Sequence, residues 1–231
     1  MLNRPARRPV QLLLGGVAGA FVACGPASSL AAATPARWSY PAAPALVRAT
    51  PSEHSRVVGR LHFLTEDDQA EVYAVLAERR VAAADYVRVS LPRRPNGATG
   101  WVPRAALGTL RTARTRLAVN RARRTAVLYR GGRIIWHARV GVGRPSLPTP
   151  AGHFYVREKL RSIGGPGYGP YAIGTSAYAA RLSDWPGGGV VGLYGTDEPN
   201  LIPGAPSHGC VRLRNREVTK LGCAVVQQWP A

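Results

Sequence analysis

Short runs in which apolar and polar residues alternate dominate the chain from residue 45 onward. Between residues 45 and 108 turn signals separate these runs, which read ALVRATPSEHSRVVGRL, EVYAVLAERR, DYVRVSLP and TGWVPRAALG. Alternation with a period of two is typical of strands that bury one face. The Asn96-Gly97 pair between the last two runs favours the positive φ of a hairpin turn. The pattern therefore predicts a small, all-β barrel over residues 45–108.

A second set of alternating runs begins at residue 115. Its strand candidates read TRLAVN, RTAVLYR, RIIWHARVGVG, HFYVREKL, YAIGTSAY and GGGVVGLYGT, and Gly131 and Gly132 signal a tight turn after the second of them. Helical periodicity is rare, so we expect a mostly antiparallel β-sandwich over residues 115–231, with one short helix after Asn215. The predicted fold class is mainly β, a barrel followed by a sandwich.

The first 33 residues have the layout of an export signal. A basic start is followed by the apolar run VQLLLGGVAGAFVA and by the small residues SLAAA. That run is too short and too rich in glycine to span a bilayer, and no other stretch approaches the roughly 20 apolar residues that a membrane helix needs. Residues 34–44 are rich in proline and alanine and predict a linker. We therefore expect an exported protein, at the cell wall or on the periplasmic or extracellular side, without a spanning segment in the mature chain.

Cys24 leaves a second interpretation of this segment open. A small residue before a cysteine at the end of the apolar run, as in FVACG, is also found where a lipid is attached. Lipid attachment at Cys24 is the alternative to cleavage after Ala33.

The chain is strongly basic, with a formal net charge of +19. Residues 1–33 hold three arginines and no acidic residue, so the rest of the chain carries +16. An exported protein meets little nucleic acid, and nucleic-acid binding is therefore not expected. Anionic cell-wall polymers are partners that this charge would attract. A GC-rich genome, which favours arginine codons, is an alternative origin of the same charge.

The tetrapeptide Ser207-His208-Gly209-Cys210 holds the residue types of cysteine nucleophilic catalysis. The reaction needs a thiolate, an approachable position and donors aimed at a developing oxyanion. Here His208 is suited to take up the thiol proton, Gly209 lets a substrate approach the backbone, and Ser207 can fix the loop. The motif alone also fits a small buried cysteine, and a disulfide between Cys210 and Cys223 is a further alternative in an oxidising compartment.

Several motifs in a fixed order identify the second region by resemblance. The segments GVGRPSLPTPAGHFYV, GPYAIGTSAY and GGGVVGLYGTDEPNLIPGAPSHGCVRLRN together resemble the L,D-transpeptidase catalytic domain, a family that cross-links bacterial peptidoglycan with a cysteine. The resemblance implies Cys210 as the nucleophile, with His208, Gly209 and Ser207 around the oxyanion region. It places Arg212 and Asn215 where the family contacts substrate or braces the site. The implied partner is a peptidoglycan stem peptide, the implied processes are cell-wall assembly and cell shape, and no cofactor or metal is required.

The first region resembles the bacterial Src-homology-3-like (SH3-like) domains of secreted wall proteins. The resemblance rests on its opening VRATPS and its closing GWVPRAALG. It implies a contact with the wall or with a protein partner, and a spacer that packs against its neighbour is the alternative.

One departure from the family concerns the proton acceptor. Upstream of its cysteine the family usually has a histidine in an HGT triplet, and this chain has Tyr194, Gly195 and Thr196. A tyrosine with an ordinary pKa near 10 is a poor base at neutral pH. Three outcomes are open: His208 takes over as the base, Tyr194 serves with a shifted pKa, or activity is weak or absent. We favour His208, because the motif places it beside the thiol.

A second departure follows Asn215. The family continues with a helix of about ten residues by resemblance, whereas here REVTK leads at once into LGCAVVQ. We therefore expect a shortened helix, with Cys223 in the turn that follows it.

Other chemistries find little support in the sequence. GVGRPS lacks the residues of a dinucleotide or phosphate loop, and no third and fourth ligand accompany His208 and Cys210 as a metal site requires. The sequence therefore predicts a secreted L,D-transpeptidase in which Cys210 forms a thioester. The alternative is a non-catalytic or weakly active wall-binding protein on the same scaffold, for which Tyr194 is the best argument.

Overall fold

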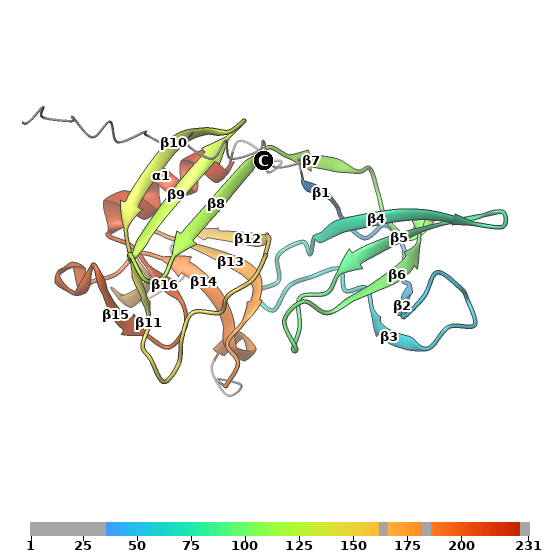
Figure 1. Ribbon diagram of the computed structural model, residues 1–231, viewed down its shortest axis with the longest axis horizontal. Helices are drawn as coiled ribbons and strands as arrows, with labels where there is room; N and C mark the ends of the chain where they lie inside the picture. The colour runs from blue at the N-terminus through green and yellow to red at the C-terminus, as the bar shows by residue number, and fades with distance from the viewer. Residues whose placement is uncertain (1–35, 162–165, 182–185, 227–231) are drawn as a thin grey trace, which may run out of the picture. The chain divides into compact units, whose positions relative to one another are not determined.

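Two regions of β-structure make up a computed structural model that describes residues 36–161, 166–181 and 186–226 (Figure 1). The predicted export signal and Cys24 lie outside the described residues. Within the described residues, no helix is long and apolar enough to cross a membrane.

The N-terminal strands pair into one seven-stranded antiparallel sheet with the order β3-β2-β6-β5-β4-β1-β7. The strands are β1 (Ala36–Ser39), β2 (Leu46–Arg48), β3 (Val57–Arg60), β4 (Tyr73–Val81), β5 (Ala84–Ser90), β6 (Thr99–Pro103) and β7 (Arg111–Ala113). Val47, Val87, Val89 and Val102 are completely buried. Alternate positions of β5 and β6 therefore fill the core, as the period-two pattern predicts.

This sheet extends beyond the predicted barrel at both ends. β1 falls inside the predicted linker of residues 34–44, and β7 follows the predicted boundary at residue 108. β1 pairs with β4 on one side and with β7 on the other, and Arg111 stacks over the ring of Trp38. These are pairings with distant segments, which a proline-rich local sequence does not reveal. The SH3-like identity of the sheet stays a prediction.

The second region begins with a three-stranded antiparallel sheet of order β10-β9-β8. Its strands are β8 (Thr115–Asn120), β9 (Thr125–Arg130) and β10 (Arg133–Arg139), where the alternating pattern predicts them. Gly131 and Gly132 have φ of 54° and 80°, a conformation that favours glycine. The predicted tight turn between β9 and β10 is confirmed.

The remaining strands form a six-stranded sheet of order β12-β13-β14-β16-β11-β15. They are β11 (Gly141–Gly143), β12 (Val156–Arg161), β13 (Tyr171–Tyr178), β14 (Val190–Tyr194), β15 (Gly204–Ser207) and β16 (Val211–Arg212). The sheet is mixed, because β14 with β16 and β11 with β15 are parallel pairs, while the other pairs are antiparallel. The parallel pair of β14 and β16 brings together two segments that both carry predicted site residues.

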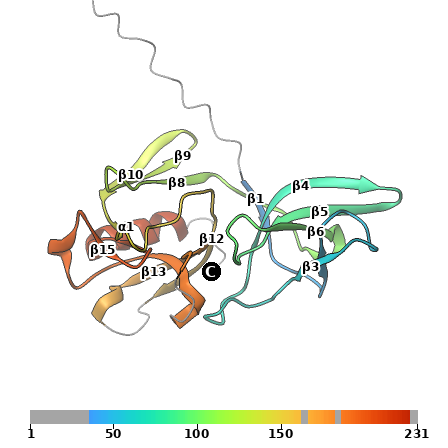
Figure 2. The same cartoon turned by 60° about the horizontal axis from the view of Figure 1, so that its bottom comes forward.

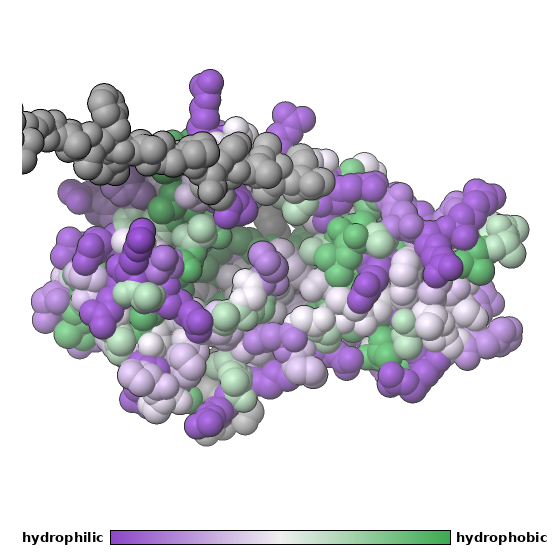
Figure 3. Space-filling model, viewed as in Figure 1, coloured by the Kyte–Doolittle hydropathy of each residue, from purple (hydrophilic) through white to green (hydrophobic). Residues whose placement is uncertain are grey.

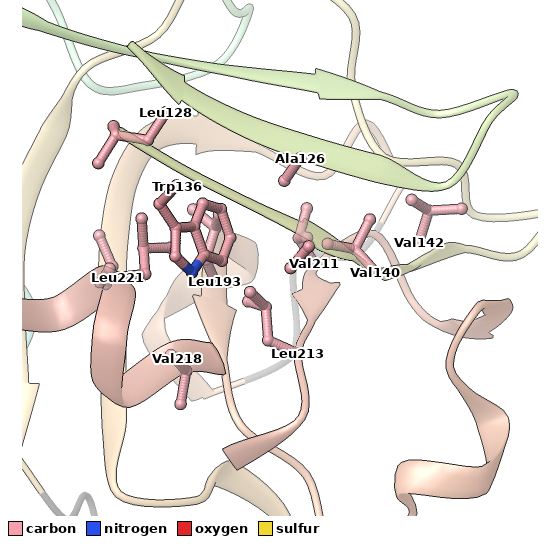
Figure 4. Close-up of a cluster of buried hydrophobic side chains, with 12 residues drawn as sticks. Ala126, Leu128, Trp136, Val140, Val142, Leu193, Val211, Leu213, Val218 and Leu221 are labelled. Atoms are coloured by element: carbon pink, nitrogen blue, oxygen red, sulfur yellow. The ribbon is translucent and has the colours of Figure 1, made fainter. Parts of the chain in front are cut away.

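Helix α1 (Asn215–Val226) lies between the two sheets of this region in the rotated view (Figure 2). The core beside it draws side chains from β9, β10, β14, β16 and α1 (Figure 4). Leu128 and Trp136 come from the three-stranded sheet, Leu193 comes from the six-stranded sheet, and Val218 and Leu221 come from the helix. This shared core joins the two sheets and the helix, as expected for a sandwich.

The expectation of a shortened helix was wrong. α1 has 12 residues and continues through Leu221, Gly222 and Cys223. Val218 and Leu221 are three residues apart and completely buried, so one apolar face carries the helix past the predicted end. At Gly222 the missing Cβ lets the helix approach the ring of Tyr171. Cys223 is exposed on the helix and does not lie in a turn.

Truncation of this helix face tests its contribution to stability. Leu221→Ala is expected to lower the free energy of unfolding by about 2–5 kcal/mol, because it leaves a cavity in the shared core. Lys220→Ala, at the exposed neighbouring position, is the control and should change stability by less than about 0.5 kcal/mol. Urea denaturation of both variants measures the difference. Equal stability of the two variants would contradict this account of the core.

Candidate functional site

Cys210 lies in the short loop between β15 and β16. Ser207 is buried at the end of β15, and its hydroxyl donates to the carbonyl oxygen of Cys210 at 2.6 Å. The same hydroxyl accepts the amide of Gly209 at 3.1 Å. One side chain therefore closes the loop on itself, and Gly209 provides the positive φ of 130° that the turn requires. Ser207 thus orders the loop, and the predicted role of Gly209 in substrate approach and the oxyanion region stays a prediction.

Strand β14 lines the thiol of Cys210. The amide of Gly192 donates to Sγ at 3.5 Å, and Sγ lies 3.9 Å from the carbonyl oxygen of Val190. The hydroxyl of Tyr194 forms a side-chain hydrogen bond with the thiol, and the charge of Arg212 also acts on it. Gly192 and Val190 were missed by the sequence reasoning, because their contribution comes from the backbone.

The surroundings of Cys210 disfavour ionisation of its thiol. Burial raises the pKa of Cys210 above its ordinary value. The Gly192 amide, the Tyr194 hydroxyl and the positive charge of Arg212 each lower that pKa, but burial is the largest effect. The site therefore contains the groups that stabilise a thiolate within surroundings that disfavour its charge.

Tyr194 interacts with both the thiol of Cys210 and the guanidinium of Arg212. In the parallel pairing of β14 with β16, Tyr194 is in register with Arg212. Burial and the neighbouring Cys210 raise the pKa of Tyr194 well above its ordinary value, and the contact with Arg212 opposes this shift. The ring of Tyr168 packs edge-on against the ring of Tyr194, with centroids 4.9 Å apart. The raised pKa favours the protonated hydroxyl, which can donate a hydrogen bond to the thiol, and a role of Tyr194 as the base stays untested.

Arg212 is held from two sides. Its guanidinium interacts with Tyr194 and donates to Glu198 Oε2 at 3.0 Å. The sequence did not predict Glu198 as a partner of Arg212. The two residues meet because the segment that follows β14 approaches β16.

Asn215 braces the segment that follows Tyr194. Its side-chain oxygen accepts the amide of Thr196 at 2.9 Å. The same oxygen lies where Gly195 or Gly169 would carry a Cβ, so both positions have room for hydrogen only. Gly195 in turn donates its amide to the carbonyl oxygen of Tyr168 at 2.9 Å. Gly195 thus serves close packing, and Asn215 contacts the backbone of this segment. Whether Asn215 braces the site or contacts substrate stays a prediction.

His208 faces a cavity of about 300 Å³ next to the cysteine loop. The cavity is also lined by Pro145, Ser146, Leu147, Pro148, Ala179, Ala180 and Arg181. The other four histidines of the chain, at positions 54, 62, 137 and 153, are exposed. His208 thus lines a cavity beside the cysteine loop, while Tyr194 and Arg212 interact with the thiol itself.

Two alternatives from the sequence can be compared with the structure. Cys210 and Cys223 are both free, so they do not form the disulfide considered above. Over the described residues, no group of three or more histidine, cysteine, aspartate or glutamate side chains could hold a metal ion.

Comparison with known proteins gives one family match. Residues 114–221 match the model of the L,D-transpeptidase catalytic domain, YkuD. The YkuD protein of Bacillus licheniformis is 32% identical over 110 residues, which cover 48% of this chain and 59% of that protein. The YkuD protein of Bacillus subtilis is 30% identical over 109 residues, with 47% and 59% covered. The chain thus spans less than two thirds of the length of these relatives.

Two solved structures that match the chain have lower sequence identity to it. The catalytic domain of an L,D-transpeptidase from E. faecium has a TM-score of 0.39 at 23% identity and covers 48% of this chain and 89% of that one. An L,D-transpeptidase from Mycobacterium tuberculosis has a TM-score of 0.39 at 16% identity, with 65% and 93% covered.

The pH dependence of thiol alkylation tests the surroundings of Cys210. The assay uses a Cys223→Ser background and measures the rate at which iodoacetamide alkylates Cys210. This rate is expected to rise with pH. The midpoint pH of the rise should lie above that of an ordinary thiol, because burial raises the pKa of Cys210. Tyr194→Phe should move the midpoint to still higher pH, since it removes a hydrogen bond that lowers this pKa. Tyr168→Phe, which keeps the ring contact, is the matched control. An unchanged or lower midpoint in Tyr194→Phe would show that its hydroxyl does not act on the thiol.

Proposed function

We propose that this chain, whose residues 114–221 match the L,D-transpeptidase catalytic domain, is a secreted enzyme that cross-links peptidoglycan through Cys210. The observation that carries the proposal is the arrangement of Gly192, Tyr194 and Arg212 around the only cysteine of the matched motif. Each of these groups stabilises negative charge on sulfur, which a structural thiol does not need.

The proposed reaction is an acyl transfer in two steps. The thiolate of Cys210 attacks the carbonyl carbon of the third residue of a tetrapeptide stem, and an S–C bond forms. The C–N bond to the terminal D-alanine then breaks, and the leaving amine takes up a proton. In the second step an amine of a neighbouring stem attacks the thioester, loses a proton and releases the thiol. Covalent catalysis of this kind replaces one high barrier by two lower ones.

The thiol gives up its proton before or during the attack. His208 is the proposed acceptor, as in the sequence interpretation, because the motif places it beside the thiol and an imidazole is the side chain most often used as a general base. Tyr194 is proposed as a donor that stabilises the thiolate, since its raised pKa makes it a poor base. Arg212 supplies a fixed positive charge to the same thiolate.

The backbone around the cysteine is the proposed oxyanion site. Gly209 donates its amide to Ser207 in the free protein, so the Cys210 amide is the remaining donor that the motif offers there. Preorganised amides of this type stabilise the tetrahedral intermediate without reorganisation during the reaction.

A second candidate function is a wall-binding protein without activity on the same scaffold. The raised pKa of Cys210 is the observation that favours it, because an effective nucleophile usually has a lowered pKa. The face in Figure 3 carries many hydrophilic side chains. The formal net charge of the chain is +19, and a positive charge attracts anionic polymers.

Covalent capture by a β-lactam separates the two functions. Incubation of residues 34–231 with imipenem is expected to add one molecule of drug, because the thiolate opens the strained lactam carbonyl as it would attack a stem peptide. Intact-mass spectrometry measures the adduct, and Cys210→Ala should lose it while Cys223→Ala keeps it. A free thiol at Cys210 without any adduct would favour the wall-binding protein.

The identity of the base is tested in the same assay. His208→Gln is expected to lower the rate of adduct formation by about 10²–10⁴-fold, the usual contribution of general acid–base catalysis. His153→Gln, at an exposed position, is the matched control and should react at the rate of the unmodified protein. A normal rate in His208→Gln would exclude His208 as the proton acceptor.

A further inference from the structure

A loop of the N-terminal sheet holds the backbone next to the candidate site. The loop of residues 91–98 joins β5 to β6 and contains Arg94 and Asn96. The side-chain Nδ2 of Asn96 donates a hydrogen bond to the carbonyl oxygen of Tyr178 at 2.8 Å. Its Oδ1 accepts a hydrogen bond from the backbone N–H of Tyr178 at 2.9 Å. Asn96 therefore satisfies both backbone groups of the last residue of β13, as a neighbouring strand would.

Arg94 fixes both sides of the connection from β13 to β14. Its Nε donates to the carbonyl oxygen of Ala179 at 2.9 Å, and Nη1 donates to that of Gly188 at 2.9 Å. The guanidinium also stacks over the ring of Tyr178 at 5.2 Å from the centroid. One rigid, planar side chain thus sets the separation of two backbone segments that are nine residues apart.

The opposite end of Tyr178 is held by the same N-terminal region. Its hydroxyl donates to Glu66 Oε1 and accepts from Arg157, and Arg157 pairs with Glu66 at 2.8 Å. Tyr178 is therefore fixed at its backbone by Asn96 and at its hydroxyl by Glu66.

The segment that Arg94 and Asn96 hold, at Tyr178 and Ala179, is connected to the thiol of Cys210 through β14. Ala179 donates its amide to Gly189 at 2.9 Å, immediately before β14 begins. Ala179 and Val191 pack in one buried cluster, and Gly209 of the cysteine loop lies against both. The next residue of β14, Gly192, is the one that donates to Cys210 Sγ.

We propose that Arg94 and Asn96 are positioning residues for the nucleophile. The N-terminal sheet is then a brace for the catalytic region and not only a spacer or a wall anchor. Its loop fixes the start of β14, and β14 fixes the groups around Cys210. The catalytic consequence rests on the proposed function, whereas the bracing does not. A displacement of about 1 Å at a reacting centre can cost on the order of 10²-fold in rate, so a brace of this kind affects turnover without touching the substrate.

The test compares Arg94→Ala and Asn96→Ala with Arg93→Ala in the full chain. Arg93 is exposed in the same loop, so its replacement removes the same charge without touching the brace. Hydrogen exchange read by mass spectrometry should be at least about 5-fold faster at the amides of Ala179 and Gly192 in Arg94→Ala and Asn96→Ala, because the hydrogen bonds that order them are lost. Exchange in β9 should stay as in the unmodified protein, which shows that the fold is intact.

Adduct formation with imipenem is measured on the same samples. The limiting rate of acylation should fall by about 10-fold or more in Arg94→Ala and Asn96→Ala, and not in Arg93→Ala. Unchanged exchange at Ala179 and Gly192 would overturn the brace. Faster exchange with an unchanged limiting rate would overturn the positioning of the thiol.

A separate readout covers failure of the proposed function. If the unmodified protein forms no adduct, the rate of Cys210 alkylation by iodoacetamide decides the question. A loosened β14 uncovers the buried thiol, so alkylation should be at least about 3-fold faster in Arg94→Ala than in Arg93→Ala. Equal alkylation rates would overturn the proposal in that case.

Discussion

The parallel pairing of β14 with β16 is the constraint on which the candidate site depends. It places Leu193 opposite Val211 and Tyr194 opposite Arg212, although 18 residues separate the members of each pair. Leu193 and Val211 are buried in the shared core, so the register is fixed by apolar packing. A slip by one residue would turn these side chains out of the core, and Tyr194 and Arg212 would leave the thiol. Core packing and site geometry are therefore set by the same register.

The balance of charge at Cys210 follows from this enclosed position. Burial shields the thiol from solvent, and the same low-polarity surroundings raise the pKa of Cys210, which the proposed reaction would need to be low. Tyr194 and Arg212 oppose the effect of burial from the strand pair, and Gly192 does so from the backbone. Tyr194 places a hydrogen-bond donor beside the sulfur at the position where the resemblance leads one to expect a histidine. In the proposed reaction, the proton of the thiol is accepted by His208, which lies outside this pair of strands.

A buried ion pair joins the N-terminal segment before β4 to β12. Arg157 and Glu71 are almost completely inaccessible, and the Nε of Arg157 donates to both carboxylate oxygens of Glu71. A buried pair of this kind adds little net stability, but removal of one partner leaves an uncompensated charge at a cost of about 3–5 kcal/mol. Breaking this pair is therefore expected to cost far more than the pair contributes to net stability. The pair acts together with the loop of Arg94 and Asn96 to fix Tyr178 at the end of β13.

The sequence alone determined the strands whose alternating pattern is strong and the motif that holds Cys210. The strands from β8 to β10 and β13 lie where the pattern predicts them, because period-two alternation is a local property. The extent of α1, the strand β1 and the contacts of Gly192, Glu198 and Arg94 were decided only by tertiary structure. They depend on pairing and burial between segments distant in sequence. A contact made by a backbone amide or carbonyl cannot be predicted from the residue type, because nearly all residue types carry the same backbone groups.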